Sequence, residues 1–304
     1  MVEFVKLKRN KDTEPKKKPL FSFKALILFT IFFFIISSLI SGIIYTFTPK
    51  IGVIKISGPI SIEKETTIYG SSTSSRETAT TIRTLADDSS VKAILIDINS
   101  GGGSPVASEE ISKSIEYAKE KKPVYSLIND IGASGAFWIS VTANKTFASS
   151  MSIVGSIGVT STTLGFEDLI KEYNITYRKQ TAGKFKDIGS PFRKPLPEEQ
   201  EILQNILDEI QTDFIEHVAK NRNMQVDDVK KYATGEIFLG SKAKEIGFID
   251  EIGYYPDVIS ELKNITDQKK ALVVEYGPEP TLAELLGVNN IFKLPGVNTN
   301  INLR

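Results

Sequence analysis

The chain has 304 residues with 37 basic and 37 acidic side chains, so its net charge is zero and no nucleic-acid partner is indicated. It contains no cysteine, which excludes disulfides, a thiolate nucleophile and cysteine-ligated metal. A single histidine, His217, makes a histidine-rich metal site impossible, and we predict neither a metal nor a cofactor.

The N-terminal part of the sequence predicts a membrane anchor. Residues 1–20 are polar and basic, and residues 1–24 are expected to form a basic N-terminal segment, whereas residues 25–47 contain no charged side chain. A helix of 23 apolar residues is long enough to cross a hydrocarbon core. Because the basic residues precede the apolar span, the N-terminus is expected in the cytoplasm. The chain is expected to cross the cell membrane once, with residues 50–304 on its outer side. A cleavable signal peptide is the alternative, but the apolar span exceeds a usual h-region and no Ala-x-Ala site follows.

The residues after the anchor alternate between strand-like and helix-like segments, which predicts an α/β fold with a largely buried parallel sheet. We expect strands at residues 51–57, 91–98, 124–128, 175–179 and 271–276. We expect helices at residues 76–87, 106–121, 136–141, 198–221 and 281–286.

A serine among small residues follows the third predicted strand. Ser134 stands in the sequence Gly132-Ala133-Ser134-Gly135, directly before a predicted helix. On a tight strand-to-helix turn the serine hydroxyl is exposed and the next backbone N–H is free, as a nucleophile requires. The alternative is a turn whose serine merely caps the helix.

Three consecutive glycines, Gly101 to Gly103, follow the second predicted strand. Because the carboxyl ends of adjacent parallel strands meet at one sheet edge, this loop is expected beside Ser134. The N–H groups of Gly103 and Gly135 would then form an oxyanion hole. A phosphate-binding loop is the alternative, but no Gly-Lys-Ser/Thr ending and no separated G-x-G-x-x-G pattern is present.

A serine nucleophile requires a base. His217 lies beside the apolar stripe of the predicted helix 198–221, which favours a surface or partly packed histidine. A lysine serves only if burial and the absence of a carboxylate partner lower its pKa toward 7 or 8 from about 10.4. Residues 182–191, with Lys184 and Lys186 among small and apolar residues, form the candidate segment.

An ordered set of motifs resembles the signal peptide peptidase A (SppA) family of Ser–Lys peptidases over about residues 50–262. The motifs are Asn99-Ser100 with the three glycines, Ala133 to Ala136, Gly155 to Val159, Lys186 to Pro191, Gly240 to Ala243 and Gly247 to Gly253. The resemblance implies a fold of repeated ββα units related to the Clp protease subunit and the crotonases. Residues 48–270 would form the peptidase domain, and residues 271–304 a C-terminal strand and tail.

The resemblance also implies roles for individual residues. Ser134 matches the nucleophile, and Lys186 matches the general base because Asp-Ile-Gly-Ser-Pro follows it as in the family. Ser156 matches the serine that positions the lysine, while Gly103 and Gly135 match the oxyanion-hole amides. In the family, the serine and the lysine can come from different repeats or from neighbouring subunits. This short, single-repeat chain is therefore expected to form a homo-oligomeric ring, although the sequence leaves open whether Ser134 and Lys186 meet within one chain.

The function implied is that of a membrane-anchored serine endopeptidase. Its expected partners are membrane lipid, through the anchor, and unfolded apolar peptides such as cleaved signal peptides, degraded at the outer face of the membrane. Two alternatives stay open: a crotonase-like acyl-transfer enzyme using the same amides, and a catalytically silent scaffold that binds apolar peptides.

Overall fold

The computed structural model describes residues 27–38, 48–67 and 70–277. The chain divides into two compact units, Met1–Thr48 and Pro49–Arg304. In the first unit, residues 27–38 are helical, and the rest of the predicted anchor and basic N-terminus lies outside the described residues, as does the predicted helix 281–286. Among the helices that the structure describes, none combines the length and apolar character needed to span a bilayer.

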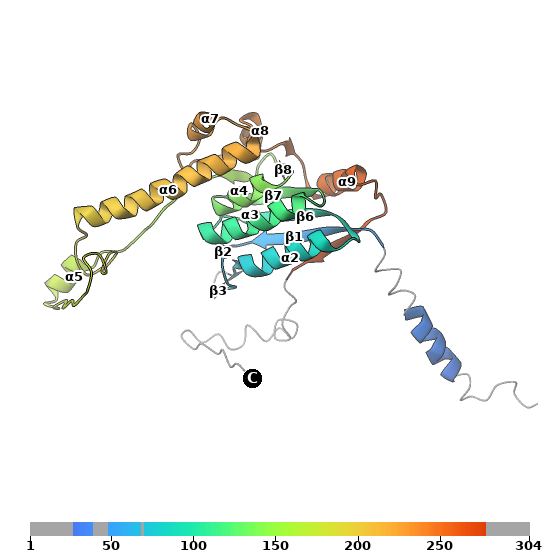
Figure 1. The fold of residues 1–304 in the computed structure, drawn as a ribbon, viewed down its shortest axis with the longest axis horizontal. Coiled ribbons are helices and arrows are strands. Elements are labelled where there is room, and N and C mark those ends of the chain that lie inside the picture. The colour runs from blue at the N-terminus through green and yellow to red at the C-terminus, as the bar shows by residue number, and fades with distance from the viewer. Residues whose placement is uncertain (1–26, 39–47, 68–69, 278–304) are drawn as a thin grey trace, which may run out of the picture. The chain divides into compact units, whose positions relative to one another are not determined.

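A largely parallel, eight-stranded sheet forms the centre of the second unit (Figure 1). Six strands follow one another in the order β10 (Ile237–Leu239), β9 (Ile153–Gly155), β7 (Val124–Ala133), β6 (Val91–Ser100), β1 (Lys50–Ser57) and β12 (Leu272–Tyr276). A branch adds β8 (Lys145–Ala148), which pairs with β7, and β11 (Glu251–Ile252), which pairs with β8. Within this sheet, only β10 and β9 pair antiparallel. The predicted α/β class with a largely parallel sheet is confirmed.

Helices and short strands complete the second unit. The helices are α2 (Ser75–Asp87), α3 (Pro105–Lys119), α4 (Gly135–Thr142), α5 (Glu167–Glu172), α6 (Pro197–Arg222), α7 (Val226–Lys230), α8 (Gly240–Glu245) and α9 (Tyr255–Ile265). Two small sheets pair β2 (Ile60–Ser61) with β5 (Thr73–Ser74) and β3 (Thr66–Thr67) with β4 (Gly70–Ser71).

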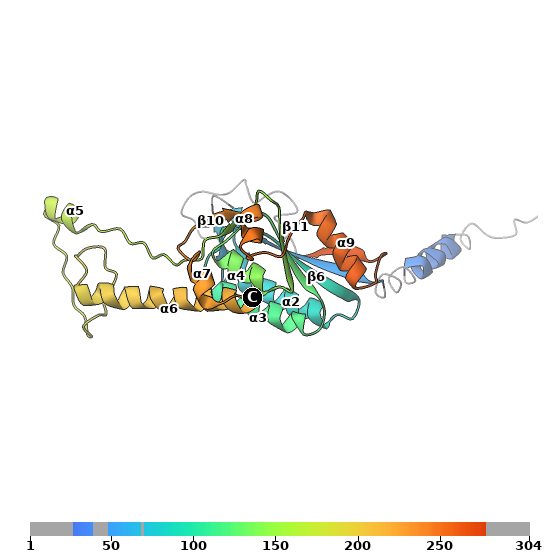
Figure 2. The ribbon, with the colours of Figure 1, turned by 90° about the horizontal axis from the view of Figure 1, so that it is seen from above.

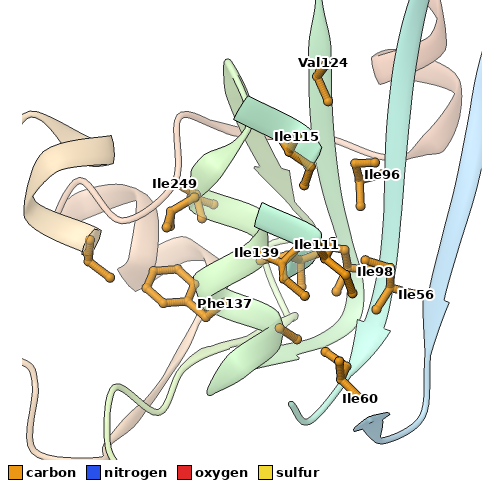
Figure 3. Close-up of a cluster of buried hydrophobic side chains, with 14 of the residues drawn as sticks. Ile56, Ile60, Ile96, Ile98, Ile111, Ile115, Val124, Phe137, Ile139 and Ile249 are labelled. Atoms are coloured by element: carbon orange, nitrogen blue, oxygen red, sulfur yellow. The ribbon is translucent and has the colours of Figure 1, made fainter. Parts of the chain in front are cut away.

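Both faces of the central sheet are buried, which explains why its strands are continuous apolar runs. In β6, Ile94, Ile96 and Ile98 point toward α2, α3 and α4, where they join a large cluster with Ile111, Ile115 and Phe137 (Figure 3). Ala93 and Leu95 point the opposite way and pack with Val258 and Leu262 of α9. The two-residue period of a strand thus divides one sequence run between two cores.

The structure confirms the predicted strands at 51–57, 91–98, 124–128 and 271–276 and the helices at 76–87, 106–121, 136–141 and 198–221, with shifts of a few residues at their ends. The strand expected at 175–179 is wrong: these residues form no regular element. They are exposed and lie beside no partner strand, so their β-branched and aromatic residues have no sheet to join.

Residues 161–196, which we call the arm, leave the sheet after β9 and return through α6. Figures 1 and 2 both show α5 and the beginning of α6 standing clear of the sheet. The 26-residue α6 packs on the core only through its second half, where Phe214, Ile215, Val218 and Ala219 are buried. The arm is therefore connected to the core by one long helix and one extended segment.

The aromatic side chains that pack on Phe137 of α4 offer a test of how the core is packed. Phe248 is fully buried, and its ring centroid lies 5.4 Å from that of Phe137. Because Phe248→Ala leaves a cavity, we expect it to lower the free energy of unfolding by about 3–5 kcal/mol. Met151→Ala, at a side chain that is 69% exposed, is the control and should change it by less than about 0.5 kcal/mol. Equal denaturant midpoints for the two variants would contradict this packing.

Candidate active site

Ser134 occupies a strained turn between β7 and α4. Its φ of 53° and ψ of −127° lie in a region that residues with a side chain rarely adopt. The turn is held because Ser134 N–H donates to Gly155 O at 2.8 Å, while Ser134 O accepts from Phe137 N–H at 2.9 Å. The hydroxyl makes no capping hydrogen bond to α4. The helix-cap alternative therefore does not describe this serine, whose side chain lines a groove instead.

The glycine loop after β6 lies directly against this turn. A Cβ added to Gly102, whose φ is +97°, would come within 2.8 Å of Gly135 N and Ser134 Cβ. A Cβ on Gly135 would lie 3.4 Å from Gly103 N. Neither the Gly103 nor the Gly135 amide donates a hydrogen bond to another described residue. The structure thus brings two available N–H donors together beside Ser134.

Ser156 follows β9 and belongs to the same surroundings. Its neighbour Gly155 accepts the hydrogen bond from Ser134 N–H, and Ser156 N–H donates to Glu236 O at 2.7 Å. Its φ of 54° is again left-handed, so the chain reverses sharply here. Four of the five predicted site residues, Ser134, Gly103, Gly135 and Ser156, therefore line one groove.

This groove has a volume of about 1220 Å³, and α6 forms one wall of it. Its acidic side chains are Glu109, Asp208, Asp213 and Glu216, whereas Lys220 is its one cationic side chain among the described residues. A groove lined in this way attracts positively charged chain segments.

Lys186 does not reach this groove within one chain. It is exposed in a turn of the arm, and its neighbour Asp187 is bound by Arg193, which also binds Glu199 in the first turn of α6. The part of α6 that lies beside Trp138, one helical turn after Ser134, is marked by Phe214, whose ring centroid is 5.3 Å from that of Trp138. Fifteen helical residues separate positions 199 and 214, which corresponds to about 22 Å.

His217 is half-buried, as its place beside the apolar stripe predicted. Its ring stacks on Trp138 at 4.0 Å between centroids and 7° between planes. Nε2 lies 3.0 Å from Trp138 O, so we assign the proton to Nε2, where it is donated to this carbonyl rather than directed at Ser134. Burial lowers the pKa of His217 to about 4.

Two groove residues close to the Ser134 turn, one in α3 and one in α4, were not among the predicted site residues. Ser108, in α3, is 1% exposed, and its Oγ lies where a Cβ on Gly135 would come, at 2.3 Å. Nothing in the local pattern of α3 distinguished this serine. Trp138 lies four residues after Ser134, one helical turn further along α4, so that spacing could have placed the chain's single tryptophan beside the site. No cluster of three metal-binding side chains occurs in the ranges described.

The buried imidazole predicts a pH dependence of stability. Unfolded His217 binds a proton with a pKa near 6.5 but folded His217 only near 4, so stability is lost as the pH falls through this window. His217→Gln keeps an N–H donor for Trp138 O without titrating. We expect wild type to lose up to about 3 kcal/mol more than His217→Gln between pH 7 and pH 4 in urea unfolding. Parallel stability curves for the two proteins would contradict the burial of a neutral ring.

Comparison with known proteins places the chain in a family. Residues 116–269 match the model of Peptidase family S49. The chain is 39% identical to a "Putative protease" of Methanocaldococcus jannaschii over 64% of its own length and 63% of the relative. It is 36% identical to the "Putative signal peptide peptidase SppA" of Enterococcus faecium (66% and 59% of the two lengths) and 35% identical to a "Putative protease" of Synechocystis (64% and 72%). The match thus spans less than two thirds of the first two relatives. The chain belongs to peptidase family S49, the family of the SppA signal peptide peptidases.

Proposed function

We propose that this chain is a serine endopeptidase in which Ser134 is the nucleophile and Lys186 the general base. The observation that carries the proposal is the strained turn at Ser134, which exposes the hydroxyl beside the free amides of Gly103 and Gly135. Strain of this kind persists only where the surrounding structure enforces it, and it is typical of reacting groups. Membership of family S49 supports the same chemistry.

In the proposed mechanism, neutral Lys186 takes the proton of Ser134 Oγ as the oxygen attacks a peptide carbonyl. The Gly103 and Gly135 amides donate to the resulting oxyanion. The lysine ammonium then gives its proton to the leaving amine as the C–N bond breaks. A water molecule, deprotonated by the same lysine, attacks the acyl ester, and the lysine returns that proton to Ser134 Oγ as the ester C–O bond breaks. Ser156, beside the serine, is proposed to hold the lysine amine in place.

The lysine comes from a neighbouring copy of the chain in this proposal. Support comes from charge: residues 177–194 carry six basic side chains and one acidic one, whereas the groove carries four carboxylates and one lysine. The arm also exposes large apolar side chains that a partner would cover. Among them are Leu164, Leu169, Tyr173 and Ile175, each at least 51% exposed. These features favour a homo-oligomeric ring in which each arm enters the next groove.

The sequence supports a proposal for the cellular setting and the substrates. We propose that residues 25–47 anchor the protein in the cell membrane, with the basic N-terminus in the cytoplasm and the peptidase outside. An enclosed ring at the membrane surface admits unfolded segments and excludes folded proteins. Cleaved signal peptides and other apolar peptides are therefore the proposed substrates, in keeping with the name of the Enterococcus faecium relative.

Three substitutions test the dyad. In the detergent-solubilised full chain, Ser134→Ala should abolish both labelling by a fluorescent serine-directed phosphonate and hydrolysis of an apolar signal peptide. Lys186→Ala should reduce hydrolysis by about 10³-fold or more, because the serine loses its base. Lys184→Ala is the matched control, because Lys184 lies only two residues before Lys186 and its Nζ pairs with Glu198 Oε1 at 2.7 Å. This variant should keep activity within about twofold of wild type.

Mixing the inactive variants tests where the lysine comes from. Ser134→Ala and Lys186→Ala chains, mixed under conditions that allow subunit exchange, should recover activity because some interfaces join an intact serine to an intact lysine. Failure to recover would contradict pairing between subunits. A folded wild type that neither labels nor cleaves would leave the peptide-binding scaffold as the better description, and activity retained by Ser134→Ala would favour crotonase-like chemistry.

The groove carboxylates provide a further test of docking between copies. Asp213→Lys places a positive charge in the wall that receives the basic arm, so we expect activity to fall several-fold and oligomers to dissociate at lower salt than in wild type. Asp227→Lys, at an exposed residue outside the groove, should leave both properties unchanged. Equal behaviour of the two variants in sedimentation and hydrolysis would argue against electrostatic docking at this groove.

A further inference from the structure

The turn that carries Lys186 is held through its neighbour, Asp187. Lys186 is exposed, and its N–H donates to Gly183 O across 3.3 Å. Gly183 has a φ of +97°, so the turn begins in the left-handed region. In the part of the chain that the structure describes, Lys186 forms no ion pair. The position of the lysine therefore depends on what holds residue 187.

Three side chains bind the Asp187 carboxylate. The Tyr177 hydroxyl donates to Oδ1 at 3.0 Å, Lys179 Nζ lies 2.9 Å from Oδ2, and Arg193 Nε donates to Oδ2 at 2.7 Å. Arg193 Nη2 donates in addition to the backbone carbonyl of Asp187 at 2.7 Å. Arg193 thus binds both the side chain and the main chain of the residue that is peptide-bonded to Lys186.

The same guanidinium binds Glu199 in the first turn of α6. Its Nη1 and Nη2 atoms donate to the two carboxylate oxygens at 2.7 and 2.6 Å. Glu199 is 1% exposed, and its Oε2 also accepts from Leu196 N–H at 2.8 Å. A bidentate pair fixes direction as well as distance. Arg193 therefore joins the Lys186 turn to the beginning of a 26-residue helix.

The charges around Lys186 are matched within this network. Arg193, followed by Lys179, lowers the pKa of Asp187 to about 2, and Arg193 with the Leu196 N–H lowers that of Glu199 to about 2. Both carboxylates are ionised, and Arg193 and Lys179 balance them. A carboxylate without these partners beside Lys186 would favour the ammonium form, which cannot accept a proton.

We propose that Arg193 is a positioning residue for Lys186: by binding Asp187 and Glu199 together, it fixes the lysine to the start of α6 and occupies the carboxylate that would otherwise pair with it. This inference rests on the proposed role of Lys186 as the base. Two further lysines of this segment are paired with carboxylates, Lys179 with Asp187 and Lys184 with Glu198, and the segment also carries Arg178 and Lys194.

The experiment compares two arginines of the full-length chain. Arg193→Lys keeps the positive charge but loses the paired N–H donors of the guanidinium group. Arg222→Lys is the matched control at the other end of α6, where Arg222 donates to both carboxylate oxygens of Asp250 at 2.7 and 2.9 Å. We expect Arg193→Lys to lower kcat about tenfold or more with KM within about twofold, while Arg222→Lys leaves kcat within about twofold. The ascending limb of the pH–kcat profile should shift to higher pH in both Arg193→Lys and Arg193→Gln, because a less tightly bound Asp187 favours the ammonium form of Lys186.

Mixing variant chains distinguishes a loss of lysine positioning in Arg193→Gln from a general loss of folding. Arg193→Gln chains mixed with Ser134→Ala chains should recover activity, because the second chain supplies an intact arm to the first chain's serine. Arg193→Gln mixed with Lys186→Ala should stay as low as Arg193→Gln alone. If Arg193→Gln does not fold, Arg193→Lys carries the same comparison.

Two results would overturn the inference in distinguishable ways. If Lys186→Ala stays active, the proposed base is wrong and the role of Arg193 fails with it. If Lys186→Ala is inactive while both Arg193 variants keep kcat within about twofold and an unshifted pH limb, the dyad stands and only the role of Arg193 fails.

Discussion

The close approach of two backbone turns is the constraint on which the site depends. The loop after β6 and the turn after β7 touch so closely that a Cβ on Gly102 would lie 2.7 Å from Gly135 N. Parallel pairing of β6 with β7, through Ser100 and Gly132, brings the two turns to the same sheet edge. Burial of both sheet faces fixes this register, because a slip of one residue would exchange the side chains of the two cores. The paired amides beside Ser134 are thus a product of the packing of the whole sheet.

Much of this arrangement could be predicted from the sequence because its causes are local. The apolar run of β6, the glycines that follow it and the small residues around Ser134 each have a direct conformational meaning. The rule that neighbouring parallel strands end at one edge then places Gly103 beside Gly135. Ser156 could be assigned only through the family motif, since its place beside Ser134 depends on a hydrogen bond between Gly155 and Ser134 that spans 21 positions.

The arm could not be predicted in the same way. Residues 175–179 have strand-forming side chains, but a strand needs a neighbour, and a local pattern does not reveal that this segment leaves the sheet. The location of Lys186 likewise follows from the length of α6 and from the Arg193 fork, which are tertiary features. The lysine motif therefore identified a residue type and an immediate context, while its distance from Ser134 in one chain emerged only from the fold.

A single helix, α6, connects the two halves of the proposed dyad. Its second half packs on Trp138 beside Ser134, and its first turn holds Glu199 and, through Arg193, the Lys186 turn. Each added residue in a helix rotates one end relative to the other by about 100° and lengthens it by about 1.5 Å. An insertion or deletion between positions 200 and 213 would therefore swing the lysine around the helix axis. Insertions or deletions in this stretch among relatives should therefore be tolerated only in numbers of residues close to whole helical turns, which keep Lys186 on the same side of α6.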